Sequence, residues 1–373
     1  MRPAHIYVHV PFCARRCSYC DFAIAVRKVV PVDAYVRLVE RELDLRYSGS
    51  SPWPVKTLYL GGGTPSHLGA DGISRLLAAF RKRVVLEHGA EVTIEANPDD
   101  VTLPGALAWR AAGINRVSLG AQSFDDRALD WMHRVHNAAS IGAAFETLQH
   151  VGFEDISLDL IFALPATLDR DWRGDLMQAI ALGPSHVSLY GLTVEPHAPL
   201  GRWVARGEVV EAPEESYESE FLLADDMLRA SGFEHYEVSN FAKPGRRARH
   251  NFSYWRGVAY AGLGPGAHEF APPERRWNVG AYAEWERRLE AASDPMDGSE
   301  SLTDENRIAE AVYLGLRTAD GLEISEAEAA HVRRWIDAGW ARLLPGNRLG
   351  LTAHGWLRLD SLAADLTLFR SRC

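Results

Sequence analysis

Short β-rich runs alternate with helical segments through the first two-thirds of the chain, and this alternation most limits the possible folds. Strands are predicted at 5–10, 56–60, 91–96, 116–120, 156–162 and 186–192, with a possible further strand at 237–241. Helices are predicted at 32–47, 73–84, 138–151, 172–182 and 216–230. Because alternating strands and helices form parallel β/α units, the expected fold class is α/β, a partial parallel β/α barrel of the TIM-like type.

The pattern changes beyond residue 271. The segment 272–302 is rich in Ser, Asp, Pro and Gly, which favours a linker. Helices are then predicted at 303–318, 326–338 and 353–369, with a hairpin turn at Pro345-Gly346-Asn347. Ser325 and Glu328 have the spacing of a capping box, and Thr352 is the expected N-cap of the last helix. We therefore expect a barrel domain at 1–271, a linker at 272–302 and a winged-helix-like α+β domain at 303–373.

Composition narrows the functional classes. The 373 residues are 47% hydrophobic and 24% charged, and the formal net charge is −10. These values are typical of a globular protein, and the acidic balance argues against nucleic acid as the partner. No run of apolar residues is long enough for a transmembrane helix, and the N-terminus does not read as a secretory signal. The cytoplasm is the expected location.

Three of the four cysteines fall within eight residues, directly after the first predicted strand. Cys13, Cys17 and Cys20 form a C-x₃-C-x₂-C loop, and the fourth is the last residue, Cys373. Structural zinc sites close with four protein ligands, whereas three thiolates on a four-iron cluster leave one iron open. The loop therefore favours an iron–sulfur cluster. Zinc completed by a histidine such as His9, or an incidental grouping, stays open at this point.

Polar residues follow several predicted strands where ligands gather in parallel β/α folds. Gly61-Gly62-Gly63 comes after the second strand and lets a ligand approach the backbone closely, although no phosphate-loop lysine follows. Asp159 lies inside an otherwise apolar strand, so it needs a ligand or a buried partner.

Combined motifs carry a resemblance over nearly the whole chain. They are YxHxPFCxxxCxYC from Tyr7, GGGTP from Gly61, EANP from Glu95, GAQSF from Gly120 and HNxxYW from His250. The chain resembles the radical S-adenosylmethionine superfamily and, within it, the HemW heme chaperones, relatives of oxygen-independent coproporphyrinogen III dehydrogenase. The resemblance implies that Cys13, Cys17 and Cys20 hold a [4Fe-4S] cluster whose open iron takes S-adenosylmethionine. It also implies nucleotide contacts at Tyr7, Gly62, Gly63, Thr64, Glu95, Gln122, Arg134 and Asp159.

Two departures favour the chaperone branch over the dehydrogenase. The dehydrogenases carry a further cysteine after the triad, where this chain has Asp21 and Phe22, and a long segment before the first cysteine, where it has twelve residues. The resemblance thus implies a protein that binds heme and passes it to respiratory apoproteins, with an electron donor for the cluster and possible peripheral membrane contact. The alternative is a dehydrogenase or another enzyme of this group. Whether the nucleotide is cleaved stays open.

The HNxxYW segment supplies a candidate heme ligand. His250 offers an imidazole beside Tyr254 and Trp255, and imidazole is a common axial ligand of heme iron. A histidine among aromatic residues is also often a hydrogen-bonded core residue, so this alternative stands beside the first. His268 is a second candidate.

Overall fold

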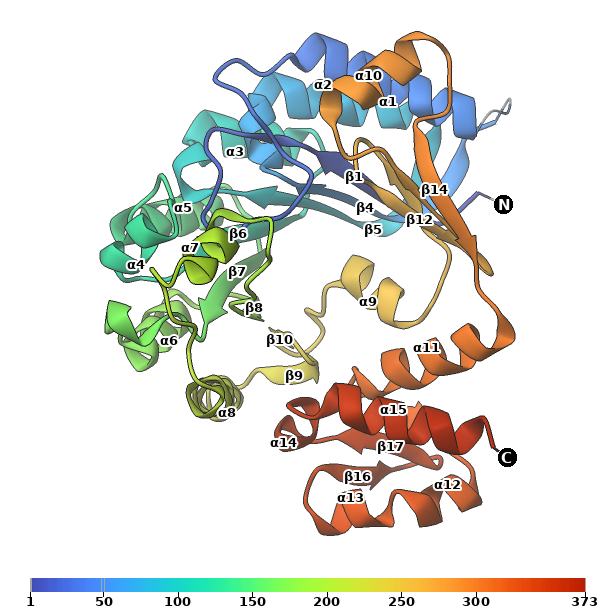
Figure 1. The fold of residues 1–373 in the computed structure, drawn as a ribbon. Helices are drawn as coiled ribbons and strands as arrows, with labels where there is room; N and C mark the ends of the chain where they lie inside the picture. The colour runs from blue at the N-terminus through green and yellow to red at the C-terminus, as the bar shows by residue number, and fades with distance from the viewer. Residues whose placement is uncertain (1, 48, 50, 373) are drawn as a thin grey trace.

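A nine-stranded sheet curves into a partial barrel in the computed structural model, which describes residues 2–47, 49 and 51–372 (Figure 1). Its order is β11-β1-β4-β5-β6-β7-β8-β10-β9. Six parallel strands form its centre: β1 (His5–Val10), β4 (Trp53–Gly62), β5 (Val84–Ala96), β6 (Arg116–Gln122), β7 (Asp155–Phe162) and β8 (His186–Gly191). The predicted α/β partial barrel is confirmed.

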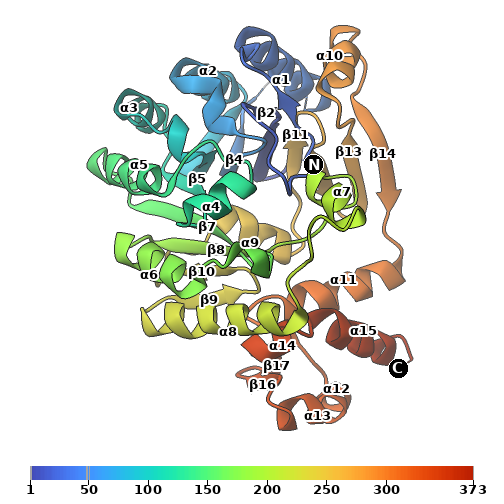
Figure 2. The ribbon, with the colours of Figure 1, turned by 60° about the vertical axis from the view of Figure 1, so that its left-hand side comes forward.

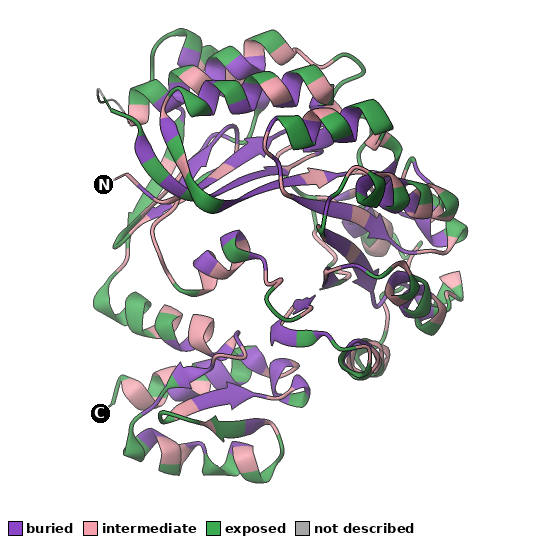
Figure 3. Ribbon diagram, turned by 180° about the vertical axis from the view of Figure 1, so that it is seen from behind, coloured by how far each residue is buried: buried purple, intermediate pink, exposed green. Residues whose placement is uncertain are grey.

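Helices cover the outer face of this sheet (Figure 2). They are α1 (Val32–Arg46), α2 (Gly69–Arg81), α3 (Leu103–Ala111), α5 (Ala138–His150), α6 (Trp172–Leu182) and α8 (Glu214–Ala230). In β1, Ile6, Val8 and Val10 are fully buried within the core cluster to which α1 contributes Val39 and Leu43. Burial of these apolar side chains on one strand face leaves the alternate positions for the interior of the barrel. Figure 3 shows the resulting pattern of buried strands and helices exposed on their outer sides.

The edges of the sheet are short strands. On one side β11 (Ala261–Leu263) runs parallel to β1, and on the other β10 (Asn240–Ala242) and β9 (Glu234–Glu237) form an antiparallel hairpin beside β8. The single strand predicted at 237–241 is therefore two strands separated by a turn. The helix α9 (Arg249–Trp255), which carries the HNxxYW segment, lies inside the curve of the sheet (Figure 1).

Residues 272–302 are not an irregular linker. They contain β13 (Glu274–Asn278), α10 (Tyr282–Glu290) and β14 (Met296–Ser301), and β12 (His268–Ala271) completes a three-stranded antiparallel sheet. Asn278 Nδ2 and Trp285 Nε1 donate to the buried carboxylate of Glu42 on α1, at 2.6 and 3.0 Å. The segment is thus fastened to the barrel.

The C-terminal part has the predicted helix, helix, hairpin, helix order. It comprises α11 (Asp304–Leu316), β15 (Leu322–Glu323), α12 (Glu326–His331), α13 (Arg333–Asp337), β16 (Ala341–Leu344), β17 (Arg348–Leu351), α14 (Ala353–Trp356) and α15 (Leu359–Arg370). The capping box of Ser325 and Glu328 is present, and Thr352 caps α14 by accepting from the Gly355 N–H. Asn347 has a positive φ of 54°, as the predicted tight turn needs.

Three predicted helices end differently from expectation. The helix predicted at 73–84 is α2, which ends at Arg81, because Val84 and Val85 pair with Trp53 and Pro54 as the start of β5. The helices predicted at 326–338 and 353–369 are each interrupted after one or two turns. Within the described ranges, no helix combines the length and hydropathy that crossing a bilayer requires. Cys373 lies outside the described residues.

Candidate functional site

A pocket of about 420 Å³ opens at the carboxyl ends of the parallel strands. Most of the residues predicted for the site line it: Cys13, Cys17, Cys20, Gly62, Gly63, Thr64, Glu95, Gln122, Arg134 and Asp159. Pockets of this size and mixed polarity are typical of small-molecule sites. The structure therefore brings together groups that are up to 146 positions apart, from Cys13 to Asp159.

Backbone hydrogen bonds to neighbouring segments hold the cysteine loop in place. Cys13 lies in β2 (Phe12–Cys13), which pairs with β3 (Ala25–Val26), so the chain folds back on itself. Ser18, fully buried, donates its N–H to the Met132 carbonyl at 3.1 Å. These backbone contacts hold the start and the middle of the loop, and all three cysteines line the pocket.

The thiols are partly buried beside groups that stabilise thiolates. Thr64 Oγ1 donates to Cys13 Sγ at 3.5 Å, and Arg134 Nη1 donates to Cys17 Sγ at 3.4 Å. Burial raises the pKa of Cys13, and it raises the pKa of Cys20 to about 11. Iron must therefore displace protons from these thiols, so that loading is favoured by rising pH.

A mononuclear zinc site is not formed here. His9 Nε2 donates to the Ala23 carbonyl at 2.8 Å, so Nδ1 accepts from the Tyr7 hydroxyl at 3.0 Å, and neither nitrogen is free for a metal. Among the residues that the structure describes, no three His, Cys, Asp or Glu side chains are grouped closely enough for one metal ion. The three thiols around a shared pocket fit the larger four-iron cluster better.

The glycines at the end of β4, together with Gly63, leave no room for a side chain. Gly62 has a φ of +116°, and a Cβ on it would lie 2.7 Å from the His9 ring. A Cβ on Gly63 would lie 2.7 Å from the Pro11 carbonyl oxygen and 2.9 Å from Cys13 Sγ. The backbone thus passes directly beside the cysteine loop, where only glycine fits.

Glu95 is the principal buried acid of the pocket. Tyr59 donates its hydroxyl to Glu95 Oε1 at 2.7 Å, and the Gly62 N–H donates to Oε2 at 3.0 Å. Burial outweighs these hydrogen bonds and raises the pKa of Glu95 to about 7. The side chain can therefore accept hydrogen bonds from an ammonium or hydroxyl group, and such a ligand would favour its ionised form.

Arg134 is the principal cation. Its Nη2 donates to Asn97 Oδ1 at 2.5 Å and to the Gly120 carbonyl at 3.1 Å. Its Nε is buried and has no hydrogen-bond partner among the described residues. An orphaned donor on a pocket-lining guanidinium suits an anionic group such as a carboxylate.

Asp159 has buried partners in the neighbouring strands, as its apolar strand context predicted. Ser118 lies 3.0 Å from both carboxylate oxygens, and Ser157 lies 3.3 Å from Oδ1. Burial raises the pKa of Asp159. Gln122 has a strained φ of 68° at the end of β6, which turns the chain into the pocket.

Sequence reasoning did not assign some pocket residues. Asn97, Ser118 and Tyr190 line the pocket, with Asn97 bonded to Arg134 and Ser118 to Asp159. Ser118 and Gln122 both line the pocket, but the register of β6 shifts between Leu119 and Gln122, so alternation along the strand does not by itself predict that they share a face.

Two predicted residues, Tyr7 and His250, do not line the pocket. Tyr7 pairs with His9 and stacks on Tyr59, with ring centroids 6.1 Å apart. It lies beneath the glycines at the end of β4, where a Cβ on Gly61 would come within 2.9 Å of its ring. Tyr7 therefore supports the pocket from inside the barrel.

His250 occupies a core position. It is 1% exposed; Nδ1 lies 2.6 Å from Thr57 Oγ1, and Nε2 lies 2.8 Å from the Tyr254 hydroxyl. Its ring stacks on that of Tyr59, with centroids 5.0 Å apart, and the backbone N–H of His250 donates to Glu91 Oε1 at 2.8 Å. Burial lowers the pKa of His250 to about 3, so the imidazole is neutral. With both nitrogens engaged, this geometry does not support the prediction that His250 ligates heme iron.

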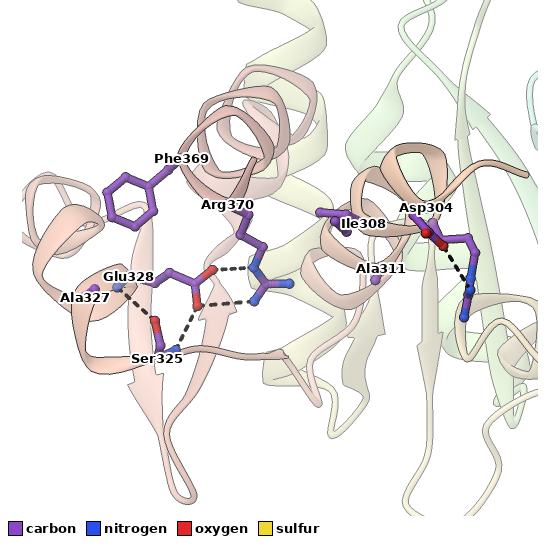
Figure 4. A pocket seen from close by; sticks show the side chains of 9 residues that line it. Asp304, Ile308, Ala311, Ser325, Ala327, Glu328, Phe369 and Arg370 are labelled. Carbon is purple, nitrogen blue, oxygen red and sulfur yellow. Dashed lines mark hydrogen bonds and ion pairs between the residues drawn. The ribbon is translucent and has the colours of Figure 1, made fainter. Parts of the chain in front are cut away.

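A roomier pocket, of about 640 Å³, lies in the C-terminal part between α11, α12 and α15 (Figure 4). The charged side chains that line it form ion pairs with one another. Arg370 pairs with Glu328, which also accepts from the Ser325 N–H at 2.8 Å, and Arg307 pairs with Asp304 at 3.4 Å. The barrel pocket is the better candidate site because it holds the thiols and an unpaired donor.

Comparisons with known proteins identify the class to which this chain belongs. The family model described as the Radical SAM superfamily matches residues 7–178, which include the cysteine loop and the predicted pocket residues up to Asp159. The solved structure of coproporphyrinogen III oxidase (HemN) from Escherichia coli, a radical SAM enzyme, has a similar fold, with a TM-score of 0.82 and 20% identity. That match covers 99% of this chain and 91% of the other. The fold and the cysteine pocket therefore define a radical SAM protein.

The particular family follows from curated relatives. The heme chaperone HemW of Mycobacterium tuberculosis (strain CDC 1551 / Oshkosh) is 38% identical over 370 residues, which are 98% of this chain and 95% of the relative. HemW of Escherichia coli (strain K12) is 35% identical, over 79% of this chain and 81% of the relative. The chain belongs to the HemW family.

Proposed function

We propose that this protein is a heme chaperone that binds a [4Fe-4S] cluster and S-adenosylmethionine and passes heme to respiratory apoproteins. The observation that carries the proposal is the similarity to heme chaperones over 98% of the chain, combined with a pocket that joins three cysteines to the polar strand ends. A reducing compartment such as the cytoplasm keeps such thiols available for iron.

The pocket residues divide into two groups under this proposal. Cys13, Cys17 and Cys20 would hold the cluster as thiolates, and the cluster would supply an iron site for the nucleotide. Arg134, whose buried Nε has no hydrogen-bond partner among the described residues, would pair with the methionyl carboxylate. Glu95 and Asp159 accept hydrogen bonds from the ammonium or the ribose hydroxyls.

Gly62, Gly63, Thr64 and Gln122 shape the same pocket. The two glycines let the nucleotide approach the backbone, and Thr64 holds Cys13 by its hydroxyl. Tyr7 acts indirectly, because its hydroxyl fixes His9 beneath Gly62. We therefore propose that Tyr7 supports the nucleotide pocket without contacting the nucleotide.

The heme ligand is proposed at a histidine other than His250. His268, the second candidate from the sequence, is exposed on β12 and stacks on Trp277 with ring centroids 5.9 Å apart. An accessible imidazole beside a large aromatic ring suits an axial ligand with a surface for the porphyrin plane. His268→Ala should then change the Soret band of the heme-loaded protein.

Heme titration tests the proposal. Purified protein is reconstituted anaerobically, its iron and sulfide are measured, and heme is added while the Soret band is recorded. We expect about four irons per chain and saturable heme binding. Iron-loaded protein that gives no saturable Soret change would refute the chaperone function.

The alternative from the sequence is a porphyrinogen-oxidising enzyme. Anaerobic conversion of coproporphyrinogen III to protoporphyrinogen IX by the reconstituted protein would establish it. The absence of a cysteine at Asp21 and Phe22 predicts no such conversion.

A further inference from the structure

The inner faces of the central parallel strands are polar, whereas the interior of a β/α barrel is usually filled by branched apolar side chains. Tyr59 on β4, Thr93 and Glu95 on β5, and Ser157 and Asp159 on β7 all lie on this side. The residues between them along each strand are apolar and belong to the core cluster beneath the outer helices. Charges in the polar interior below the barrel pocket therefore act on one another with little screening by water.

Arg116 is a buried cation of this interior. It lies at the start of β6, is 4% exposed, and pairs in register with Thr93 on β5. Arg116 forms no hydrogen bond or ion pair with any described residue, and its Nη1 atom is buried without a partner. The side chain does not line the barrel pocket. Because a buried charge without a partner is costly, its position calls for an effect on groups that it does not touch.

The strand that carries Arg116 lies between the two strands that carry the pocket acids, Glu95 on β5 and Asp159 on β7 (Figure 1). Ser118, two positions after Arg116 on the same strand face, pairs in register with Glu95, and its hydroxyl lies 3.0 Å from both oxygens of Asp159. Two positions along a strand span about 7 Å. Arg116 therefore lies one step of the strand face below both acids, and between them.

Burial favours the neutral form of both acids. It raises the pKa of Glu95 to about 7 and also raises the pKa of Asp159, and in both cases the charge of Arg116 opposes this rise. Glu91 on β5 is a further acid near Arg116. Burial keeps the other surrounding groups neutral, because it raises the pKa of the tyrosines and lowers the pKa of the histidines: Tyr7, Tyr59, Tyr190, Tyr236, Tyr254, His186 and His250. Arg116 is thus the positive charge among these described groups.

We propose that Arg116 is a positioning residue of the barrel pocket, which acts through Glu95 and Asp159 and keeps their carboxylates ionised for a positively charged ligand. The proposal rests on the proposed binding of S-adenosylmethionine, which carries an ammonium group. An ionised carboxylate accepts hydrogen bonds at both oxygens and attracts the ammonium, whereas the neutral acid keeps a proton on one oxygen. Because Arg116 also repels a cation, its net effect is favourable only where the acids would otherwise be protonated.

The pH dependence of nucleotide affinity tests the proposal. Calorimetry of the iron-reconstituted protein compares the wild type with Arg116→Met, which removes the charge, and with Arg116→Lys, which keeps it. The control is Thr93→Val, at the neighbour in register, whose fully buried hydroxyl has no partner among the described residues. We expect Arg116→Met to bind S-adenosylmethionine about fivefold more weakly at about pH 7, because the midpoint of the pH profile rises by about one unit. At about pH 9 this variant should bind as tightly as the wild type or more tightly.

Arg116→Lys should restore the wild-type profile, and Thr93→Val should leave it unchanged. A second readout needs no nucleotide: infrared titration follows the carboxylic-acid band that Glu95→Gln removes, and its midpoint should also rise by about one pH unit in Arg116→Met. Circular dichroism checks that each variant folds, and Arg116→Gln is the second variant without the charge.

The outcomes separate this proposal from the proposed function. Affinity that is lost equally at every pH, or an infrared midpoint that is the same without the charge, would refute the role of Arg116 and leave the proposed function intact. Reconstituted wild-type protein that binds no S-adenosylmethionine would refute the proposed nucleotide site, and the role of Arg116 with it.

Discussion

Replacement of His250 by alanine distinguishes a core histidine from a heme ligand. The change removes a buried ring that stacks on Tyr59 at 5.0 Å and takes a hydrogen-bond partner from the Tyr254 hydroxyl, 2.8 Å away. Thr57 keeps a second partner, because its Oγ1 also lies 2.9 Å from His5 Nδ1. The variant therefore leaves one cavity and one hydroxyl without its partner.

These two losses set the magnitude. Truncation of a large buried side chain costs about 2–3 kcal/mol at a site that partly collapses, and an unsatisfied hydroxyl adds about 1–2 kcal/mol. We expect the free energy of unfolding of His250→Ala to fall by about 4 kcal/mol. His250→Asn, which retains a polar group for one partner, should lose about half as much.

The assay is denaturant unfolding of the cluster-free protein, followed by heme titration of the reconstituted variants. The exposed His268→Ala is the matched control, with a stability change within about 0.5 kcal/mol. The Soret spectrum should be unchanged in His250→Asn and altered in His268→Ala. If His250→Asn kept its stability and lost the Soret band, our placement of His250 in the core would be wrong.

Further predictions concern the barrel pocket. Nucleotide binding should strengthen as pH rises through about 7, because the cationic ligand requires the carboxylate of Glu95, whose pKa is raised to about 7. At pH 6 the affinity should be about tenfold below that at pH 8, as measured by calorimetry, and Glu95→Gln should flatten this profile. Arg134→Ala should weaken nucleotide binding by about 2 kcal/mol and leave heme affinity unchanged; equal loss of both would contradict separate sites. Gly63→Ala should prevent cluster assembly by forcing a methyl group against the Pro11 carbonyl and Cys13, whereas Cys373→Ser should retain the iron. Iron analysis after reconstitution would show either outcome.

The positions of the central strands could be predicted because the pattern of apolar residues within each strand reflects which of its faces are buried. The charge of Asp159 in an apolar strand and the motif that contains Glu95 singled out these residues, and both line the barrel pocket. The sequence could not show that Thr57 and Tyr254 take both nitrogens of His250, because the contact with Thr57 spans 193 positions and depends on where α9 packs. The HNxxYW motif reads the same whether its histidine binds heme iron or packs in the core.

The segment 272–302 shows a second limit. Its Ser, Asp, Pro and Gly content is typical of a linker, yet β13 forms because β12 and β14 supply hydrogen-bond partners on both sides. Strands with little apolar content depend on such pairing rather than on local propensity. Glu42, buried on α1 and bonded to Asn278 and Trp285, anchors the segment through contacts between residues far apart in the chain.

Heme transfer under anaerobic conditions tests the central claim most directly. Heme-loaded, iron-reconstituted protein is mixed with a respiratory apoprotein, and the heme in each is measured after separation; coproporphyrinogen III is supplied in a parallel reaction. We predict that heme moves to the apoprotein and that coproporphyrinogen III is not consumed. Heme that stays on the chain while coproporphyrinogen III is converted to protoporphyrinogen IX would contradict the account.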